Sequence, residues 1–182
     1  MFKGTSASAG IGIGKAVIVE EAELVITRNE VADAEGEIQR FKGALEKTIA
    51  ATQKMADDLA SRVGEKEAEI MQGHMMLLSD PMLTGEIESS IRNDKVNSEF
   101  AIENVCSMYA DMFASMGDEL MQQRATDMRD IKVRMQRTLM GLESVDVSLL
   151  PKGSILVAKD LTPSMTAGIN PENVSGIVTE LG

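Results

Sequence analysis

The chain has 182 residues, of which 43% are hydrophobic and 26% charged, so it is long enough for one sizeable core or two small ones. Its net charge of −11 argues against nucleic acid as a partner, because phosphates would be repelled, and favours a basic partner. It has no signal-peptide pattern and no apolar run of the roughly 18 residues that a membrane span needs, which predicts a cytoplasmic protein without membrane insertion.

Residues 4–28 are expected to be extended, with the glycine-rich stretch Gly10–Lys15 leading into the strand-like run Ala16–Val19. The glycines are not those of a Walker A loop, which requires Gly at position 9 and Ser or Thr after Lys15. A dinucleotide-binding fingerprint requires a helix where Ala16–Val19 predicts a strand. We therefore expect small residues that let another backbone come close to this strand, and no nucleotide site.

From Glu30 to Glu143 the apolar residues recur about every three and a half positions, which predicts helices. A long helix is expected to end near Gly64, and shorter ones are expected to begin at Glu65, Asp80, Asn97 and Asp118, with Gly141 near the end of the last. In the last two helices the spacing places these residues inward: Phe100, Val105, Met108, Met112, Phe113, Met128, Ile131, Met135, Leu139 and Leu142.

The last thirty residues predict a strand, a short helix and a second strand. Ser154–Val157 and Val174–Thr179 are short apolar runs typical of buried strands. Thr162 and Pro163 form a helix start, with Thr as N-cap and Pro at the first helical position.

The two terminal pieces are each too small to bury a sheet alone, so we expect them to pair with each other. The fold class is then an α/β domain made of residues 1–28 and 145–182, with an all-α helical bundle or hairpin inserted at residues 29–144. Most of the negative charge falls in the inserted block, which makes it a candidate docking surface for a basic partner.

Few residues can carry chemistry. Cys106 is the single cysteine, which excludes an internal disulfide and predicts a buried, inert thiol. His74 is the single histidine, in apolar company where a packing role is more common than catalysis, and no metal site is expected. The spacings of Arg124, Asp127, Asp130 and Arg134 predict ion pairs on a helix surface. These residues alone indicate a helical interaction domain on an α/β base, without a complete active site.

Four stretches together resemble the amino-terminal domain of enzyme I of the phosphoenolpyruvate:sugar phosphotransferase system. They are Gly4–Lys15, Gly73–Leu78 (GHMMLL), Arg124–Ile131 (RATDMRDI) and Ala158–Ala167 (AKDLTPSMTA), and the match is collinear over the whole chain. Ala9 departs from the proline common in the family.

The resemblance implies a phosphohistidine α/β domain with an inserted helical bundle. It also implies transfer of a phosphoryl group from phosphoenolpyruvate, through a histidine, to the small carrier protein HPr in sugar uptake. Gly182 matches the first glycine of the family motif G-G-R-T-S-H-T, so the phosphorylated histidine is expected beyond this chain, and the fragment itself should not be phosphorylated. Magnesium and phosphoenolpyruvate belong to a carboxyl-terminal barrel in the family. We therefore expect a fragment without cofactor that is a monomer, from a parent that is a homodimer.

The resemblance also assigns roles to individual residues. Thr166 matches a threonine that hydrogen-bonds and orients the active histidine, although an ordinary helix hydroxyl is the alternative. The positions implied to bind HPr are Glu65, His74, Met76, Leu77, Asp80, Leu83 and Arg124. Pro81 and Met82 replace an acidic pair of the family, so the interface here is expected to be more apolar.

Two other interpretations stay open. A helical scaffold for protein interactions, without transfer chemistry, fits a chain whose active histidine is missing. A phosphohistidine domain of a pyruvate phosphate dikinase or phosphoenolpyruvate synthase shares the strand–helix–strand tail, but those enzymes lack the long helical insertion.

Overall fold

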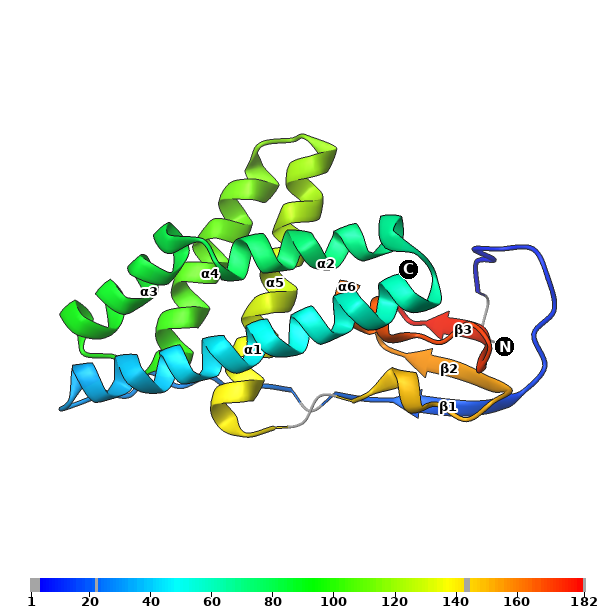
Figure 1. The fold of residues 1–182 in the computed structure, drawn as a ribbon, viewed down its shortest axis with the longest axis horizontal. Coiled ribbons are helices and arrows are strands. Elements are labelled where there is room, and N and C mark those ends of the chain that lie inside the picture. Colours follow the sequence, from blue (N-terminus) through cyan, green and yellow to red (C-terminus); the bar gives the residue numbers. More distant parts are fainter. Residues whose placement is uncertain (1–3, 22, 143–144, 182) are drawn as a thin grey trace.

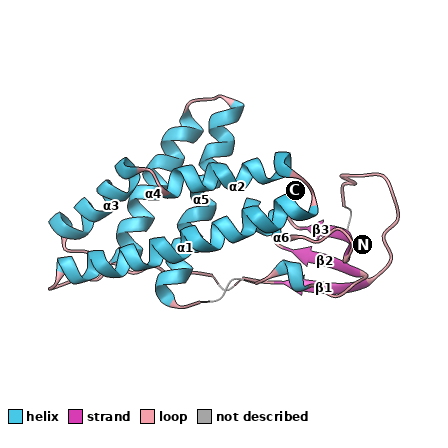
Figure 2. Ribbon diagram, viewed as in Figure 1, coloured by secondary structure: helices cyan, strands magenta, loops and turns pink. Residues whose placement is uncertain are grey.

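The computed structural model describes residues 4–21, 23–142 and 145–181 and shows a mostly helical protein with a small parallel sheet at one end (Figures 1 and 2). Two long helices, α1 and α5, cross each other, and α4 and α5 form a hairpin that projects away from the sheet (Figure 1). In chain order the elements are β1 (Lys15–Val19), α1 (Ala34–Arg62), α2 (Glu65–Leu78), α3 (Pro81–Asp94), α4 (Ser98–Ser115), α5 (Glu119–Met140), the 3-10 turn η1 (Val147–Leu149), β2 (Ser154–Ala158), α6 (Pro163–Gly168) and β3 (Val174–Thr179).

The sheet joins the two ends of the chain, as the sequence predicts. Its order is β1-β2-β3, both pairings are parallel, and Lys15 lies opposite Ser154. The glycine-rich stretch before β1 passes close to other backbone: a side chain at Gly12 would overlap the carbonyl of Ser175, and one at Gly14 that of Gly153. The predicted close backbone approach is therefore confirmed.

Most helix starts follow from local capping. Asp80 caps α3 through the amide of Met82, Thr162 caps α6 through that of Met165, and a proline follows each cap. The long helix α1 begins later than Glu30, because Asp33 is its N-cap. Glu30 instead forms an antiparallel bridge with Val96, and the amide of Val31 donates to the carbonyl of Lys95 at 2.9 Å.

The main core lies among α1, α3, α4 and α5, and it confirms the predicted burial of Val105, Met128, Ile131 and Met135. The predicted burial of three other residues is wrong. Met108 and Met112 lie outside the face that α4 packs with Ala101, Ile102, Cys106 and Ala110, and Leu142 follows the end of α5, where helical spacing no longer applies; all three are exposed.

Cys106 is buried, as predicted, and burial raises its pKa to about 12, so the thiol is protonated at neutral pH. Among the described residues, no helix combines the length and the apolar character needed to cross a membrane.

Candidate functional site

The short helix α6 carries Thr166, the residue expected to orient a histidine. The side chain of Thr166 is exposed, and its Oγ1 donates to the carbonyl of Thr162 at 3.0 Å. The hydroxyl oxygen can still accept a hydrogen bond from an incoming N–H. The helix therefore presents Thr166 to solvent on a turn that Thr162 and Pro163 define.

The position of α6 depends on Asp130 of α5. The carboxylate accepts hydrogen bonds from the Ser164 amide and from the Ser164 hydroxyl, both at 2.8 Å. Asp130 is only 4% exposed, so the predicted surface ion pair with Arg134 is wrong. A charged acceptor in a buried site makes strong hydrogen bonds, and this pair holds the start of α6 against the helical core.

His74 of α2 lies between Asp130 and Asp127. Its Nε2 is 3.2 Å from Oδ1 of Asp127, whereas its Nδ1 is 3.9 Å from Oδ2 of Asp130 and has no hydrogen-bond partner among the described residues. The side chain has no exposed surface. His74 therefore cannot touch a docked protein in this conformation, although it supports Asp127, which is partly exposed.

Arg124 of α5 contacts Asp127 as well. Its Nη1 is 3.5 Å from Oδ2 of Asp127, which confirms the predicted i, i+3 pair. The guanidinium crosses α2 at Gly73, where a Cβ atom would overlap Nη1. Glycine at position 73 thus lets Arg124 reach Asp127 across the surface of α2.

The remaining predicted docking residues divide into exposed and buried ones. Met76 is 70% exposed and Glu65 is exposed, whereas Leu77 is partly buried and Asp80 is occupied as the cap of α3. Leu83 is only 2% exposed and belongs to the main core. The neighbouring Met82 is 67% exposed, so the apolar side chain that α3 offers to solvent is Met82.

Tyr109 of α4, which was not among the predicted site residues, lies near Glu86 of α3 and near Asp80, the N-cap of α3. Burial raises the pKa of Tyr109, and the negative charges of Glu86 and Asp80 raise it further. Its ring centroid is 6.2 Å from that of Phe113. No local motif marks Tyr109, because its acidic neighbours lie more than twenty residues earlier in the chain.

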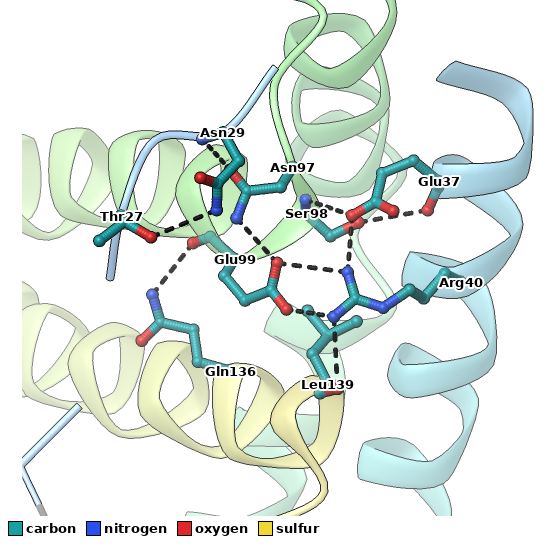
Figure 3. A network of polar contacts seen from close by, with 9 residues as sticks. All are labelled: Thr27, Asn29, Glu37, Arg40, Asn97, Ser98, Glu99, Gln136 and Leu139. Carbon is teal, nitrogen blue, oxygen red and sulfur yellow. Dashed lines mark hydrogen bonds and ion pairs between the residues drawn. The ribbon is translucent and has the colours of Figure 1, made fainter. Parts of the chain in front are cut away.

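A second polar cluster ties the segment before α1 to the helices (Figure 3). Asn97 accepts a hydrogen bond from the amide of Asn29 at 2.9 Å and donates one to Glu99 at 2.9 Å. Arg40 pairs with Glu37 at 2.7 Å and also with Glu99. Partial burial opposes ionisation of Glu99, but hydrogen bonds from Arg40 and Asn97 lower its pKa overall. This cluster fastens α1, α4 and the incoming chain together, which is a structural role.

Among the described residues, no group of three or more acidic, histidine or cysteine side chains is placed to hold a metal ion. The exposed Met76 and Met82 and the partly exposed Arg124 are side chains that suit protein contact, and α6 offers the hydroxyl of Thr166.

Comparisons with known proteins cover nearly all of the chain. Residues 3–124 match the family described as PEP-utilising enzyme, N-terminal, and residues 150–182 match the family described as PEP-utilising enzyme, mobile domain. Phosphoenolpyruvate-protein phosphotransferases are 39% identical in Bacillus subtilis and 40% identical in Listeria monocytogenes, in each case over 100% of this chain. The chain spans 32% of the length of these relatives.

Two solved structures have the same fold. The solution structure of an Enzyme I protein (nEIt) superimposes with a TM-score of 0.89 and 36% identity, over 100% of this chain and 74% of that one. The N-terminal domain of Enzyme 1 – Nitrogen gives a TM-score of 0.68 over 95% of this chain and 71% of that one. At 24% identity, this second likeness concerns the fold alone.

Proposed function

The chain belongs to the PEP-utilising enzymes, and we propose that it is the amino-terminal part of a phosphoenolpyruvate-protein phosphotransferase. In this proposal a phosphoryl group passes from phosphoenolpyruvate to a histidine of the enzyme and then to a histidine of HPr. His74 is not that histidine, because a side chain without exposed surface cannot reach a substrate. In this proposal, magnesium and phosphoenolpyruvate would bind in a part of the enzyme that this chain does not span.

The role of the chain is to dock HPr. The observation that carries this proposal is the position of Met76 and Met82, each about two-thirds exposed, at the adjoining ends of α2 and α3. Exposed methionines adapt to a partner surface, and carboxylates at the rim steer a basic partner. Glu65, Asp80 and Arg124 would form this rim, while Leu77, Leu83 and His74 would support it from beneath.

The proposal also gives different roles to the two parts of the chain. Residues 1–28 and 145–182 would form the phosphohistidine-type unit, and residues 29–144 would form the HPr-binding unit. Thr166 would accept a hydrogen bond from the active histidine and so fix its ring orientation. The exposed position of Thr166 supports this role, since the hydroxyl oxygen is open to an incoming group.

The docking proposal is tested by titrating the isotope-labelled chain with unlabelled HPr and following amide chemical shifts. Perturbations should fall on residues 65–83 and around Arg124, and Met76→Ser should weaken binding at least tenfold. Met140→Ser is a matched control, because Met140 is also exposed but lies at the opposite end of α5 from Arg124. Shifts confined to the sheet, or no binding at millimolar HPr, would refute the docking role.

A further inference from the structure

A cavity of about 290 Å³ lies where α1 and α5 meet η1 and α6, a region that the proposed docking surface does not use. The residues that line it come from both parts of the chain, the helical block and the carboxyl-terminal segment. Its volume is near the lower end of the roughly 300–1,000 Å³ found for small-molecule pockets. The cavity is therefore large enough for a small ligand.

Arg134 of α5 lines this cavity. Its Nη2 donates to the hydroxyl of Thr52 at 2.7 Å. Its Nη1 is buried and has no hydrogen-bond partner, and no carboxylate among the described residues lies within ion-pair distance. Burial lowers the pKa of Arg134, against the opposing charge of Asp130. An arginine nevertheless stays protonated at neutral pH.

Most of the carboxylates that line the cavity are held by other residues of the same lining. Asp130 accepts two hydrogen bonds from Ser164, and Asp146 accepts two from the amide and hydroxyl of Ser148. Glu21 lies 3.5 Å from the guanidinium of Arg137. Asp58 is the remaining acidic side chain in the lining, and it is exposed.

Besides Arg134 and Arg137, two other cationic side chains line the cavity. Lys54 is exposed at its edge. Arg62 donates to the carbonyls of Ala167 and Ile169, both at 3.0 Å, and these neutral acceptors leave its charge uncompensated. The acidic and basic side chains of the lining balance in number, so the feature that distinguishes the cavity is the unused buried N–H donor of Arg134.

We propose that this cavity binds a small oxyanion, a phosphate or a carboxylate, with Arg134 as its principal ligand. A buried N–H group without an acceptor is unfavourable, and an anion would supply the acceptor that Nη1 lacks. Arginine presents paired N–H donors that match the oxygen spacing of either group. Because the cavity lies between α5 and α6, the bound anion would fasten the helical block to the segment that carries Thr166.

The test is a titration of the 182-residue chain with inorganic phosphate and, separately, with acetate, at ionic strength held constant with sodium chloride. Amide chemical shifts are expected to saturate at one site and to fall on the cavity residues Thr48, Val133 and Val147. Arg134→Met should weaken this binding at least tenfold. The same variant is expected to fold, and in chloride alone to melt no lower than the wild type, because it removes an unpaired buried charge. The tighter of the two probes identifies the class of oxyanion.

Arg129→Met is the matched control, because Arg129 lies on the same helix but is exposed and 3.9 Å from Asp111. It should leave the affinity for phosphate and acetate unchanged. The proposal is overturned if neither anion saturates by 100 mM, about the range of weak specific sites. Equal affinity in the wild type and Arg134→Met would overturn it as well, and so would shifts scattered over surface lysines. If Arg134→Met does not fold, the position of the wild-type shifts decides between these outcomes.

Discussion

Asp130 and Ser164 connect two parts of the protein that lie far apart in the sequence: one carboxylate of α5 accepts both the amide and the hydroxyl hydrogen bonds at the start of α6. The same carboxylate lies beside His74, which contacts Asp127 on the proposed docking side. Asp130 thus connects the helical block to α6.

The substitution Asp130→Asn should destabilise the protein by about 2 kcal/mol, because the amide nitrogen cannot accept a hydrogen bond from Ser164. Urea denaturation measures this loss. Asp111→Asn is the control, since Asp111 is exposed and its contact with Arg129 at 3.9 Å should be worth less than about 1 kcal/mol. Equal effects of the two substitutions would contradict the anchoring role of Asp130.

The substitution Gly73→Ala should separate binding from stability. Alanine favours the helix by up to about 1 kcal/mol, but its Cβ would displace the guanidinium of Arg124 from Asp127. We therefore expect weaker HPr binding with little or no loss of melting temperature. Gly85→Ala provides the control, because nothing lies within 4 Å of a Cβ at Gly85. An unchanged HPr affinity in Gly73→Ala would exclude Arg124 from the interface.

Leu83 and Met82 are adjacent on α3, yet substitution of Leu83 should affect stability and substitution of Met82 should affect HPr binding. Leu83→Ala should cost about 3 kcal/mol of stability, because it removes a buried side chain from the main core. Met82→Ala should change stability by less than about 0.5 kcal/mol, as is usual for surface positions, and weaken HPr binding. Chemical denaturation and HPr titration of both variants check this. A large stability loss in Met82→Ala would place Met82 in the core.

The pH dependence of stability should contain a contribution from Glu99, whose pKa is lowered in the folded state. Such a group stabilises the fold above its unfolded pKa of about 4.3, and this contribution is lost as the pH falls through the lower folded pKa. Glu99→Gln should therefore show a shallower fall in stability below about pH 4.3 than the wild type, measured by urea titrations across that range. Parallel curves for the two proteins would show that Arg40 does not stabilise the charged form.

Features set by neighbouring residues could be predicted from the sequence. The caps and prolines at Asp80 and Thr162 define the starts of α3 and α6, and the apolar runs predict all three strands. Features that depend on distant partners could not be predicted. Glu30 leaves the helix because Val96 pairs with its backbone, and Asp130 is buried because Ser164 reaches it from α6.

The different exposure of Met82 and Leu83 also depends on distant parts of the chain. Both residues are apolar, and only the packing of α3 against the other helices decides which one faces the core. For the same reason His74 could be singled out as a residue but not placed, since its burial depends on α5.

The pairing of Lys15 with Ser154 has a kinetic consequence. The chain between Lys15 and Ser154 forms a long loop when β1 pairs with β2. Closing this loop directly would cost considerable chain entropy and slow the formation of the sheet. The helices reduce this cost. Asn97 holds Asn29 at the start of the helical block, and Arg40 donates to the carbonyl of Leu139 near the end of the block. Once the helices have assembled, β1 and β2 leave the block as near neighbours, so the sheet should be the last element to fold and the first to exchange its amide hydrogens.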